Sequence, residues 1–179
     1  MLRLDDTFLI LIDVQGKLWN VMFEKEALLE NTQKLVKGLQ LLGAPIIMTE
    51  QNPRGLGPTV PDLSQLIPEI KPLPKFCFSC YQNQEFQDAL TSLKRRQALV
   101  CGIEAHICVY QTTLELLNNG YEVQVVADAV SSRTLRNREI ALTRMQSEGA
   151  KLTSTEMALF ELLKPAESSK FRELSRIIK

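Results

Sequence analysis

Three side chains that could act together in covalent chemistry lie at or just after segments that read as β-strands. Asp13 lies near the end of the apolar segment 7–14, Lys75 closes the segment 72–75, and Cys108 follows the segment 97–102. In an open parallel sheet, ligands bind outside the carboxyl ends of the strands. We therefore expect Asp13, Lys75 and Cys108 to meet at that edge.

These residue types fit nucleophilic catalysis. Cys108 stands where a strand gives way to a helix, and a helix N-terminus with a nearby cation lowers a thiol pKa from roughly 8.5 to ~3.5–7.5. Lys75 would be that cation, and Asp13 could take the thiol proton and later return it to a leaving amine. Taken singly, each residue also has a structural interpretation: a cap for Asp13, a surface charge for Lys75 and a buried packing thiol for Cys108.

Strand-like and helix-like segments alternate along the chain, which predicts an α/β domain with a mostly parallel sheet. Strands are expected at 7–14, 44–50, 72–75, 97–102, 121–128 and 150–154, and helices at 28–43, 84–95, 106–119, 136–149 and 155–163. The Pro- and Gly-rich stretch 51–75 is longer than an ordinary connection, so we expect a functional loop there.

The 179 residues fit one domain, expected at 1–165, with an amphipathic tail at 166–179. The apolar residues of the tail that fall on one side are Phe171, Leu174, Ile177 and Ile178. This pattern favours packing on the body or on a subunit partner over a role at a membrane surface.

Composition disfavours several classes of partner. Lys plus Arg (21) equals Asp plus Glu (21), and no basic stripe is interleaved with aromatic residues, so no nucleic acid is expected. The apolar run 8–12 is too short for a membrane span or a signal-peptide core, so we expect a cytoplasmic protein, with delivery to an organelle left open. Four cysteines without a secretory signal favour reduced thiols.

Cys77 and Cys80 form a CxxC motif with three interpretations. The motif could be half of a zinc site completed by Cys101 and Cys108, a redox pair, or two packing thiols. The spacing does not suit a compact second half of a zinc site, so packing thiols are favoured.

Several stretches of the chain resemble the isochorismatase-like cysteine hydrolases, in particular the branch of isochorismatase domain-containing proteins. They are ILIDVQ, TEQNPRGLGPTV, KFCFSCY, CGIEAHICVYQTTLELLNNGYEVQVVADAVSSR and EIALTRMQSEGAKLTSTEMALFELL. The resemblance covers nearly the whole chain except the tail, and implies a three-layer Rossmann-like sandwich and an Asp13, Lys75, Cys108 triad. It also implies a cis peptide bond between Ile103 and Glu104, with the amides of Glu104 and Cys108 as an oxyanion hole.

Four further residues are candidates for substrate contacts. Gln15 and Trp19 follow the first strand, Gln51 follows the second, and Tyr81 lies just past Lys75. For Trp19 and Tyr81, packing in the core or at an interface is an equal alternative.

The chain departs from the nicotinamidase members that the resemblance brings in. Those members hold a metal with aspartate and histidines, whereas His106 is the single histidine of this sequence, so we expect no metal and no other cofactor. The presence of Cys108 favours hydrolysis of a small-molecule amide or carbamoyl C–N bond through a thioacyl intermediate. Hydrolysis of an isochorismate-like vinyl ether and a non-catalytic binding or scaffold role remain as alternatives. Since this family commonly assembles, a homo-oligomer is expected.

Overall fold

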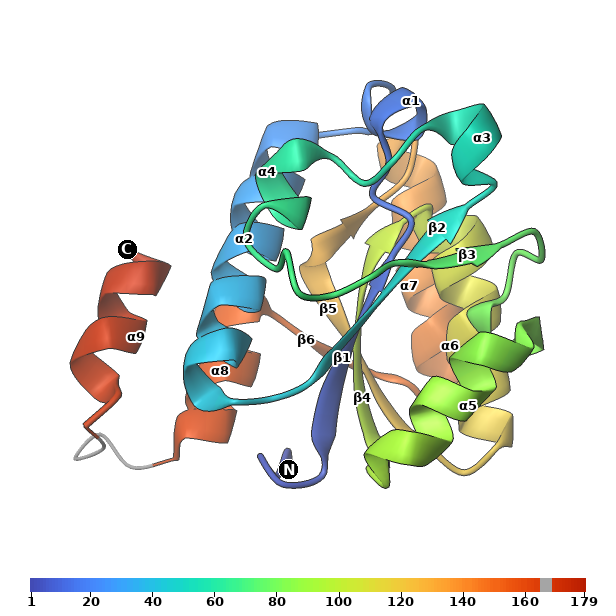
Figure 1. Cartoon of the computed structure of the whole chain (residues 1–179). Coiled ribbons are helices and arrows are strands. Elements are labelled where there is room, and N and C mark those ends of the chain that lie inside the picture. Colours follow the sequence, from blue (N-terminus) through green and yellow to red (C-terminus); the bar gives the residue numbers. More distant parts are fainter. Residues whose placement is uncertain (165–168) are drawn as a thin grey trace.

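Six parallel strands form one sheet in the order β3-β2-β1-β4-β5-β6 in the computed structural model, which describes residues 1–164 and 169–179 (Figure 1). The strands are β1 (Thr7–Ile12), β2 (Ile46–Gln51), β3 (Leu73–Lys75), β4 (Gln97–Ile103), β5 (Glu122–Ser131) and β6 (Lys151–Thr153). Every residue of β1 and β4 is buried, as expected for central strands covered on both faces. The predicted α/β class with a parallel six-stranded sheet is confirmed.

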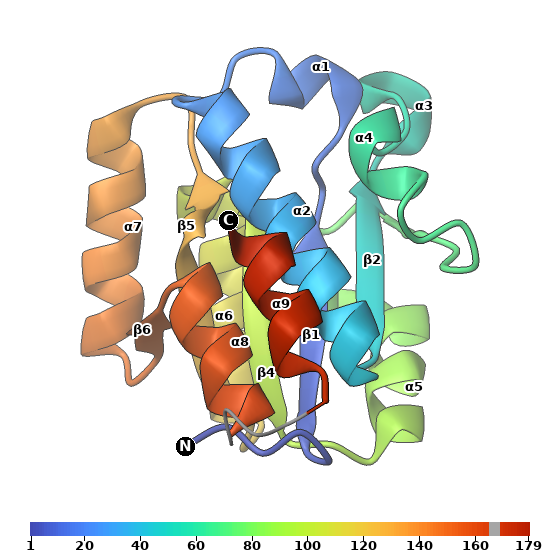
Figure 2. The same cartoon turned by 90° about the vertical axis from the view of Figure 1, so that its left-hand side faces the viewer.

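Helices cover both faces of this sheet (Figures 1 and 2). One face carries α2 (Lys25–Leu42), α8 (Thr155–Leu163) and α9 (Phe171–Ile178), and the other carries α5 (Gln84–Leu93), α6 (Tyr110–Asn118) and α7 (Leu135–Ser147). The three short helices are α1 (Gly16–Trp19), α3 (Pro53–Leu56) and α4 (Pro61–Ser64). They follow the carboxyl ends of β1 and β2, so they border the edge where the reactive residues were expected.

The structure differs from the sequence prediction at several element boundaries. The predicted loop 51–75 contains α3 and α4, each opened by a proline at a first helical position, where its missing N–H costs nothing. β5 runs to Ser131 rather than ending at Asp128, because the register shifts after Val100 and lets Gly102 pair with Val130. The predicted helix 106–119 is a turn of π-helix, Ala105–Val109, followed by α6.

The tail packs on the body of the molecule (Figure 2). Leu174 of α9 is fully buried in the core cluster shared with α2 and α8, and the rings of Phe160 and Phe171 lie 6.2 Å apart. The predicted boundary between the domain and the tail, at 165–166, lies outside the described residues. Within the two described ranges, no helix combines the length and apolar character needed to cross a bilayer.

We expect Leu174→Ala to lower the free energy of unfolding by about 2 kcal/mol or more, because truncating a fully buried leucine removes apolar contacts and leaves a cavity. The control Glu173→Ala changes an exposed side chain of the same helix and should stay within about 0.5 kcal/mol of the parent protein. Urea unfolding followed by circular dichroism measures both. Equal midpoints for the two variants would contradict this account of α9.

Candidate active site

The three residues expected at the sheet edge lie together in the structure. Asp13 directly follows β1, Lys75 is the last residue of β3, and Cys108 lies in the π-helical turn after β4. Lys75 Nζ lies 2.6 Å from Asp13 Oδ2, and the Cys108 thiol lies near enough to both groups for their charges to change its pKa. All three are buried, with exposed fractions of 0% for Asp13, 2% for Lys75 and 5% for Cys108.

The Lys75 ammonium is surrounded by oxygen acceptors. Besides Asp13 it donates to Gln51 Oε1 at 2.8 Å and to the carbonyl oxygens of Phe78 at 3.2 Å and Cys77 at 3.3 Å. Burial opposes its charge, but the interactions with Cys80, Asp13 and Cys108 outweigh burial and raise the pKa of Lys75. Lys75 is therefore a fixed cation at neutral pH.

The Cys108 thiol is protonated in the resting protein. Burial raises its pKa well above the ordinary thiol value, and the Asp13 carboxylate adds to this rise by its charge and its hydrogen bond, while Lys75 opposes it. The expectation that Cys108 has a lowered pKa is therefore wrong, because burial and the carboxylate outweigh the cation. A thiolate can form at neutral pH only if Asp13 accepts the proton.

The turn between β4 and Cys108 has an unusual backbone. Gly102 has φ +115°, and a Cβ atom there would lie 2.1 Å from the carbonyl oxygen of Ile12, so only glycine lets β4 pass so close to β1. The Ile103–Glu104 peptide bond is cis, the geometry that the family resemblance implies. The buried Glu104 carboxylate accepts from Arg133 Nε at 3.0 Å and from the Arg133 backbone N–H at 3.2 Å, which fixes the turn.

The π-helical turn that carries Cys108 is held by the carbonyl oxygen of Glu104, which accepts from the N–H groups of Ile107 at 3.0 Å and Val109 at 3.3 Å. Single π-helical turns are rare and are frequent at functional sites. This turn carries the Cys108 thiol, whose pKa the neighbouring Asp13 carboxylate helps to raise.

Two of the four candidate substrate contacts are occupied in holding the site together. Gln15 is fully buried, accepts from the Gln51 N–H at 2.7 Å, and donates to the carbonyl oxygens of Gln51 at 3.1 Å and Gly57 at 2.6 Å. The Gln51 side chain joins Lys75 to the carbonyl oxygen of Phe76. Substrate contact by these two residues, and by the half-buried Trp19 and Tyr81, stays a prediction.

The sequence alone does not single out Thr49, which is in direct contact with Asp13. Its hydroxyl donates to Asp13 Oδ1 at 2.7 Å from the neighbouring strand β2. A threonine among the apolar residues of a buried strand is the one signal that could have indicated it, because a buried hydroxyl needs a partner.

The four cysteines are free thiols, and the three buried ones lie on two sides of the sheet. Cys101 packs in the cluster beneath α2 and α8, whereas Cys80 and Cys108 pack in the cluster beneath α5, α6 and α7. Among residues 1–164 and 169–179, no group of three or more His, Cys, Asp or Glu side chains is arranged to hold a metal ion. The zinc interpretation of the four cysteines is therefore wrong.

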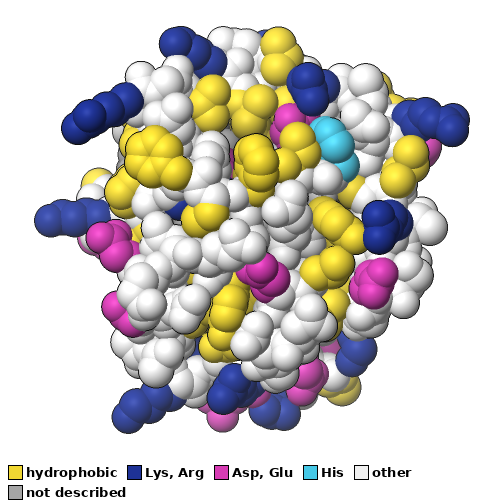
Figure 3. Space-filling view, turned by 90° about the vertical axis from the view of Figure 1, so that its right-hand side faces the viewer, with side chains coloured by type: hydrophobic (Ala, Val, Ile, Leu, Met, Phe, Trp, Pro, Cys, Tyr) yellow, Lys and Arg dark blue, Asp and Glu magenta, His cyan; other side chains and the backbone are white. Residues whose placement is uncertain are grey.

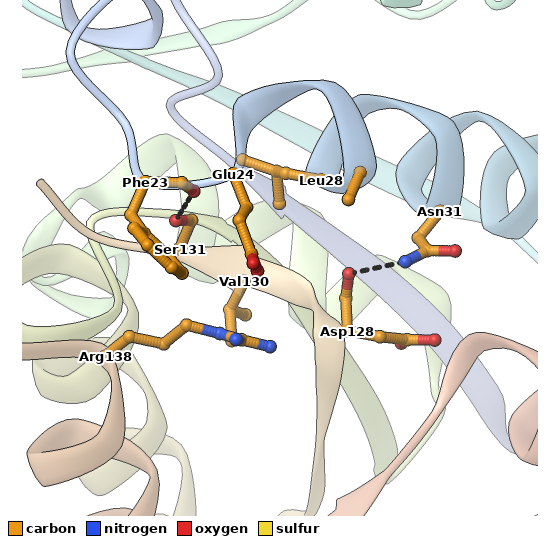
Figure 4. Close-up of a pocket in the computed structure, with 9 residues that line it drawn as sticks. Phe23, Glu24, Leu28, Asn31, Asp128, Val130, Ser131 and Arg138 are labelled. Atoms are coloured by element: carbon orange, nitrogen blue, oxygen red, sulfur yellow. Dashed lines mark hydrogen bonds between the residues drawn. The ribbon is translucent and has the colours of Figure 1, made fainter. Parts of the chain in front are cut away.

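A cavity of about 140 Å³ lies apart from the three reactive residues, between α2, β5 and α7 (Figure 4). Its charged lining residues are Glu24, Asp128 and Arg138, and none of Asp13, Lys75 or Cys108 lines it. The chemistry of the buried cluster does not extend into this cavity.

Comparisons with known proteins identify a family and a fold. The sequence profile of the isochorismatase domain matches residues 7–157. Human isochorismatase domain-containing protein 2 is 38% identical over 171 residues, covering 96% of this chain and 82% of the human protein. The solved structure titled MAR1 ribonuclease from Caenorhabditis elegans is 34% identical, with a TM-score of 0.91 and coverage of 99% of this chain and 91% of that chain.

A further solved structure shows the same fold at lower identity. The YcaC gene product of Escherichia coli, described as an octameric hydrolase of unknown specificity, is 24% identical with a TM-score of 0.94, covering 99% of this chain and 88% of that chain. At this identity the similarity shows the fold alone.

The pKa causes at Cys108 predict opposite effects for its two charged neighbours. Asp13→Asn removes the carboxylate that raises the pKa of Cys108, so alkylation of Cys108 by iodoacetamide at pH 10–11, where the thiol loses its proton to water and not to Asp13, should become faster. Lys75→Met removes the cation that lowers this pKa, so alkylation should become slower. Peptide mass spectrometry gives both rates, with the partly exposed Cys77 as an internal reference. Changes of the same sign in the two variants would contradict this assignment.

Proposed function

Because the chain belongs to the isochorismatase domain family of hydrolases, we propose that it hydrolyses the amide or carbamoyl C–N bond of a small molecule with Cys108 as nucleophile. The observation that carries this proposal is the buried ion pair of Asp13 with Lys75 beside the Cys108 thiol. A nucleophile, a base and a fixed cation in one buried cluster are the parts that covalent acyl transfer requires.

In the first half of the proposed reaction, the Cys108 sulfur attacks the carbonyl carbon while its proton passes to Asp13. The oxyanion that develops is stabilised by the backbone amides of Glu104 and Cys108, and Lys75 balances the negative charge as it moves. The C–N bond then breaks, the leaving amine takes the proton from Asp13, and a thioacyl enzyme remains.

In the second half, water attacks the thioacyl carbon and gives a proton to Asp13. The C–S bond breaks, the sulfur recovers the proton from Asp13, and a carboxylic or carbamic acid is released. Every proton transfer passes through one carboxylate, so no metal or other cofactor is required by this course. All four cysteines are free thiols, which suits a reducing compartment, and we place the activity in the cytoplasm on that ground.

We expect Cys108→Ala to lower kcat/KM for a primary amide or ureido substrate by about a thousandfold or more, because the covalent route is lost. Asp13→Asn should cause a loss of similar size, and the double variant should lose little more, since the two residues act as one unit. A panel of primary amides and ureido acids, followed by ammonia release, measures these rates. Intact mass spectrometry of the quenched reaction should show a thioacyl adduct on the parent protein.

The alternatives give different results in the same experiments. A vinyl ether hydrolase would keep its rate in Cys108→Ala and release no ammonia. A scaffold protein would turn over no substrate in the panel and show no adduct. RNA serves as the third comparison, because one structural relative is titled a ribonuclease, and degradation of RNA by the parent but not by Cys108→Ala would redirect the proposal.

We also propose that the chain forms a homo-oligomer through the apolar rim of this edge. Phe76 and Phe78 follow Lys75 directly and are 76% and 54% exposed. Hydrophobic side chains gather on the upper part of the face that carries α5, α6 and α7 (Figure 3). Exposed aromatic side chains beside a buried cluster fit a subunit interface better than open water.

We expect the parent protein to sediment as an oligomer and the double variant Phe76→Asp, Phe78→Asp to sediment as a smaller species, because two charges would be buried without partners at the interface. Met157→Asp is the control, since Met157 is 62% exposed on α8, on the other side of the sheet. Sedimentation velocity measures the masses. An unchanged mass in the Phe variant together with a smaller mass in the Met157 variant would move the interface to α8.

A further inference from the structure

A series of hydrogen-bonded polar side chains ends at the Oδ1 atom of Asp13. Thr49 Oγ1 donates to Asp13 Oδ1 at 2.7 Å, while Lys75 occupies Oδ2. Cys80 Sγ lies 3.7 Å from Thr49 Oγ1, and the Cys80 backbone N–H donates to Thr112 Oγ1 at 2.9 Å. Cys80, Thr49 and Thr112 are all buried, so these contacts are shielded from water.

The direction of hydrogen bonding along this series follows from counting protons. A hydroxyl group has one proton, and that of Thr49 is committed to Asp13, so the Cys80 thiol must be the donor in its contact with Thr49. Burial raises the pKa of Cys80 to about 12, so the thiol keeps its proton at neutral pH. The hydrogen bonds are therefore donated from Cys80 to Thr49 and from Thr49 to the Asp13 carboxylate.

The segment that carries Cys80 is tied to the helix that continues from Cys108. Besides the bond from Cys80 to Thr112, the Ser79 hydroxyl donates to the carboxylate of Glu115, and both acceptors lie on α6. Thr112 follows Cys108 by four residues. The two thiols are thus held around Asp13 by one helix.

We propose that Thr49 and Cys80 are positioning residues that decide where the proton shared by Asp13 and Cys108 rests. A hydrogen bond donated to a carboxylate favours its ionised form. By donating to Asp13 Oδ1, Thr49 favours the proton on the Cys108 sulfur over the proton on Asp13, and Cys80 strengthens this donation. The inference rests on the proposed function, since it concerns the proton that Asp13 would take from the nucleophile.

The groups that face Asp13 come from four places in the fold. Lys75 approaches from β3, Thr49 from β2, Cys80 from the 3₁₀ turn Cys80–Gln82, and Cys108 from the π-helical turn. Among these, Thr49 is a donor that does not itself titrate in the accessible pH range, so it can be changed without altering the charge of the cluster.

The test is the rate of Cys108 alkylation by iodoacetamide from pH 6 to 11, read at the Cys108 peptide by mass spectrometry. Thr49→Val removes the donor and keeps the shape, whereas Thr49→Ser keeps the donor. We expect Thr49→Val to raise the rate near pH 7 about tenfold, the size of one hydrogen bond to a charged group, because more of the proton moves to Asp13 and leaves a thiolate. The difference from the parent should shrink toward pH 11, where the rate rises by loss of the Cys108 proton to water, a step that does not use Asp13 as the acceptor. Thr49→Ser should stay within about twofold of the parent.

Cys80 gives an independent pair of variants. Cys80→Ala should raise the rate near pH 7 by a smaller factor, about two- to threefold, because it weakens the Thr49 donation without removing it. Cys80→Ser restores a donor and should match the parent. If Thr49→Val does not fold, this pair decides: unequal rates support the inference and equal rates overturn it.

Two outcomes would overturn the inference. A folded Thr49→Val protein whose rate changes by the same factor at every pH has altered access to the sulfur and not the place of the proton. An effect of Thr49→Val that persists in the Asp13→Asn background does not act through Asp13, because coupled residues must lose their separate effects in the double variant. Neither measurement uses a hydrolysable substrate, so failure of the proposed hydrolysis would be seen separately, in the ammonia assay.

Discussion

The buried ion pair between Lys75 and Asp13 is the interaction on which the rest of the site depends. The two side chains are 1% and 0% exposed, and removing charges from water costs several kcal/mol per ion unless good geometry and further hydrogen bonds offset it. Lys75 has further acceptors in Gln51 and two backbone carbonyl oxygens, and Asp13 also accepts from Thr49. The surrounding loops are shaped largely by this need for partners.

The sheet topology makes that pair possible. β3 and β1 are not neighbours, so Lys75 must reach past β2, and Gln51 at the end of β2 accepts a bond from it on the way. The chain runs to one side of β1 through β2 and β3, and then to the other side through β4, β5 and β6. The point where the strand order reverses therefore lies between β1 and β4, where open parallel sheets bind ligands. Asp13 follows β1 and Cys108 lies in the turn after β4, so the two residues lie on the two sides of this point. Gly102 allows the close approach of β4 to β1.

The sequence was sufficient to predict the fold class and the meeting of Asp13, Lys75 and Cys108, because that needs only the strand ends and the parallel alternation of elements. Other features depend on contacts that no local pattern contains. Thr49 lies in a buried strand, and its partner comes from another strand. Gln15 resembles a ligand contact in sequence, yet its amide is bonded to residues 51 and 57, which approach only after the intervening loop has folded.

The pKa of Cys108 could not be predicted from the sequence for a related reason. The chain offers a cation and an anion as neighbours of the thiol, and residue types alone do not say which one prevails. Burial decides the sign, because it penalises the thiolate whatever its neighbours are. Burial is a property of the whole packed structure around α6 and the π-helical turn, not of the residues next to Cys108 in the chain.

A raised pKa of Cys108 is compatible with its proposed role as a nucleophile. The pKa describes loss of the proton to water, which would leave Asp13 and Cys108 both negative beside one cation, Lys75, in a buried site. Passing the proton from sulfur to Asp13 instead leaves the cluster with the same net charge, since one anion replaces another next to Lys75. A buried environment strongly opposes the creation of an uncompensated charge, but it opposes the movement of a charge within a compensated cluster far less. The burial that protects the resting thiol from solvent can therefore coexist with its activation, provided that the acceptor of the proton is Asp13 and not water.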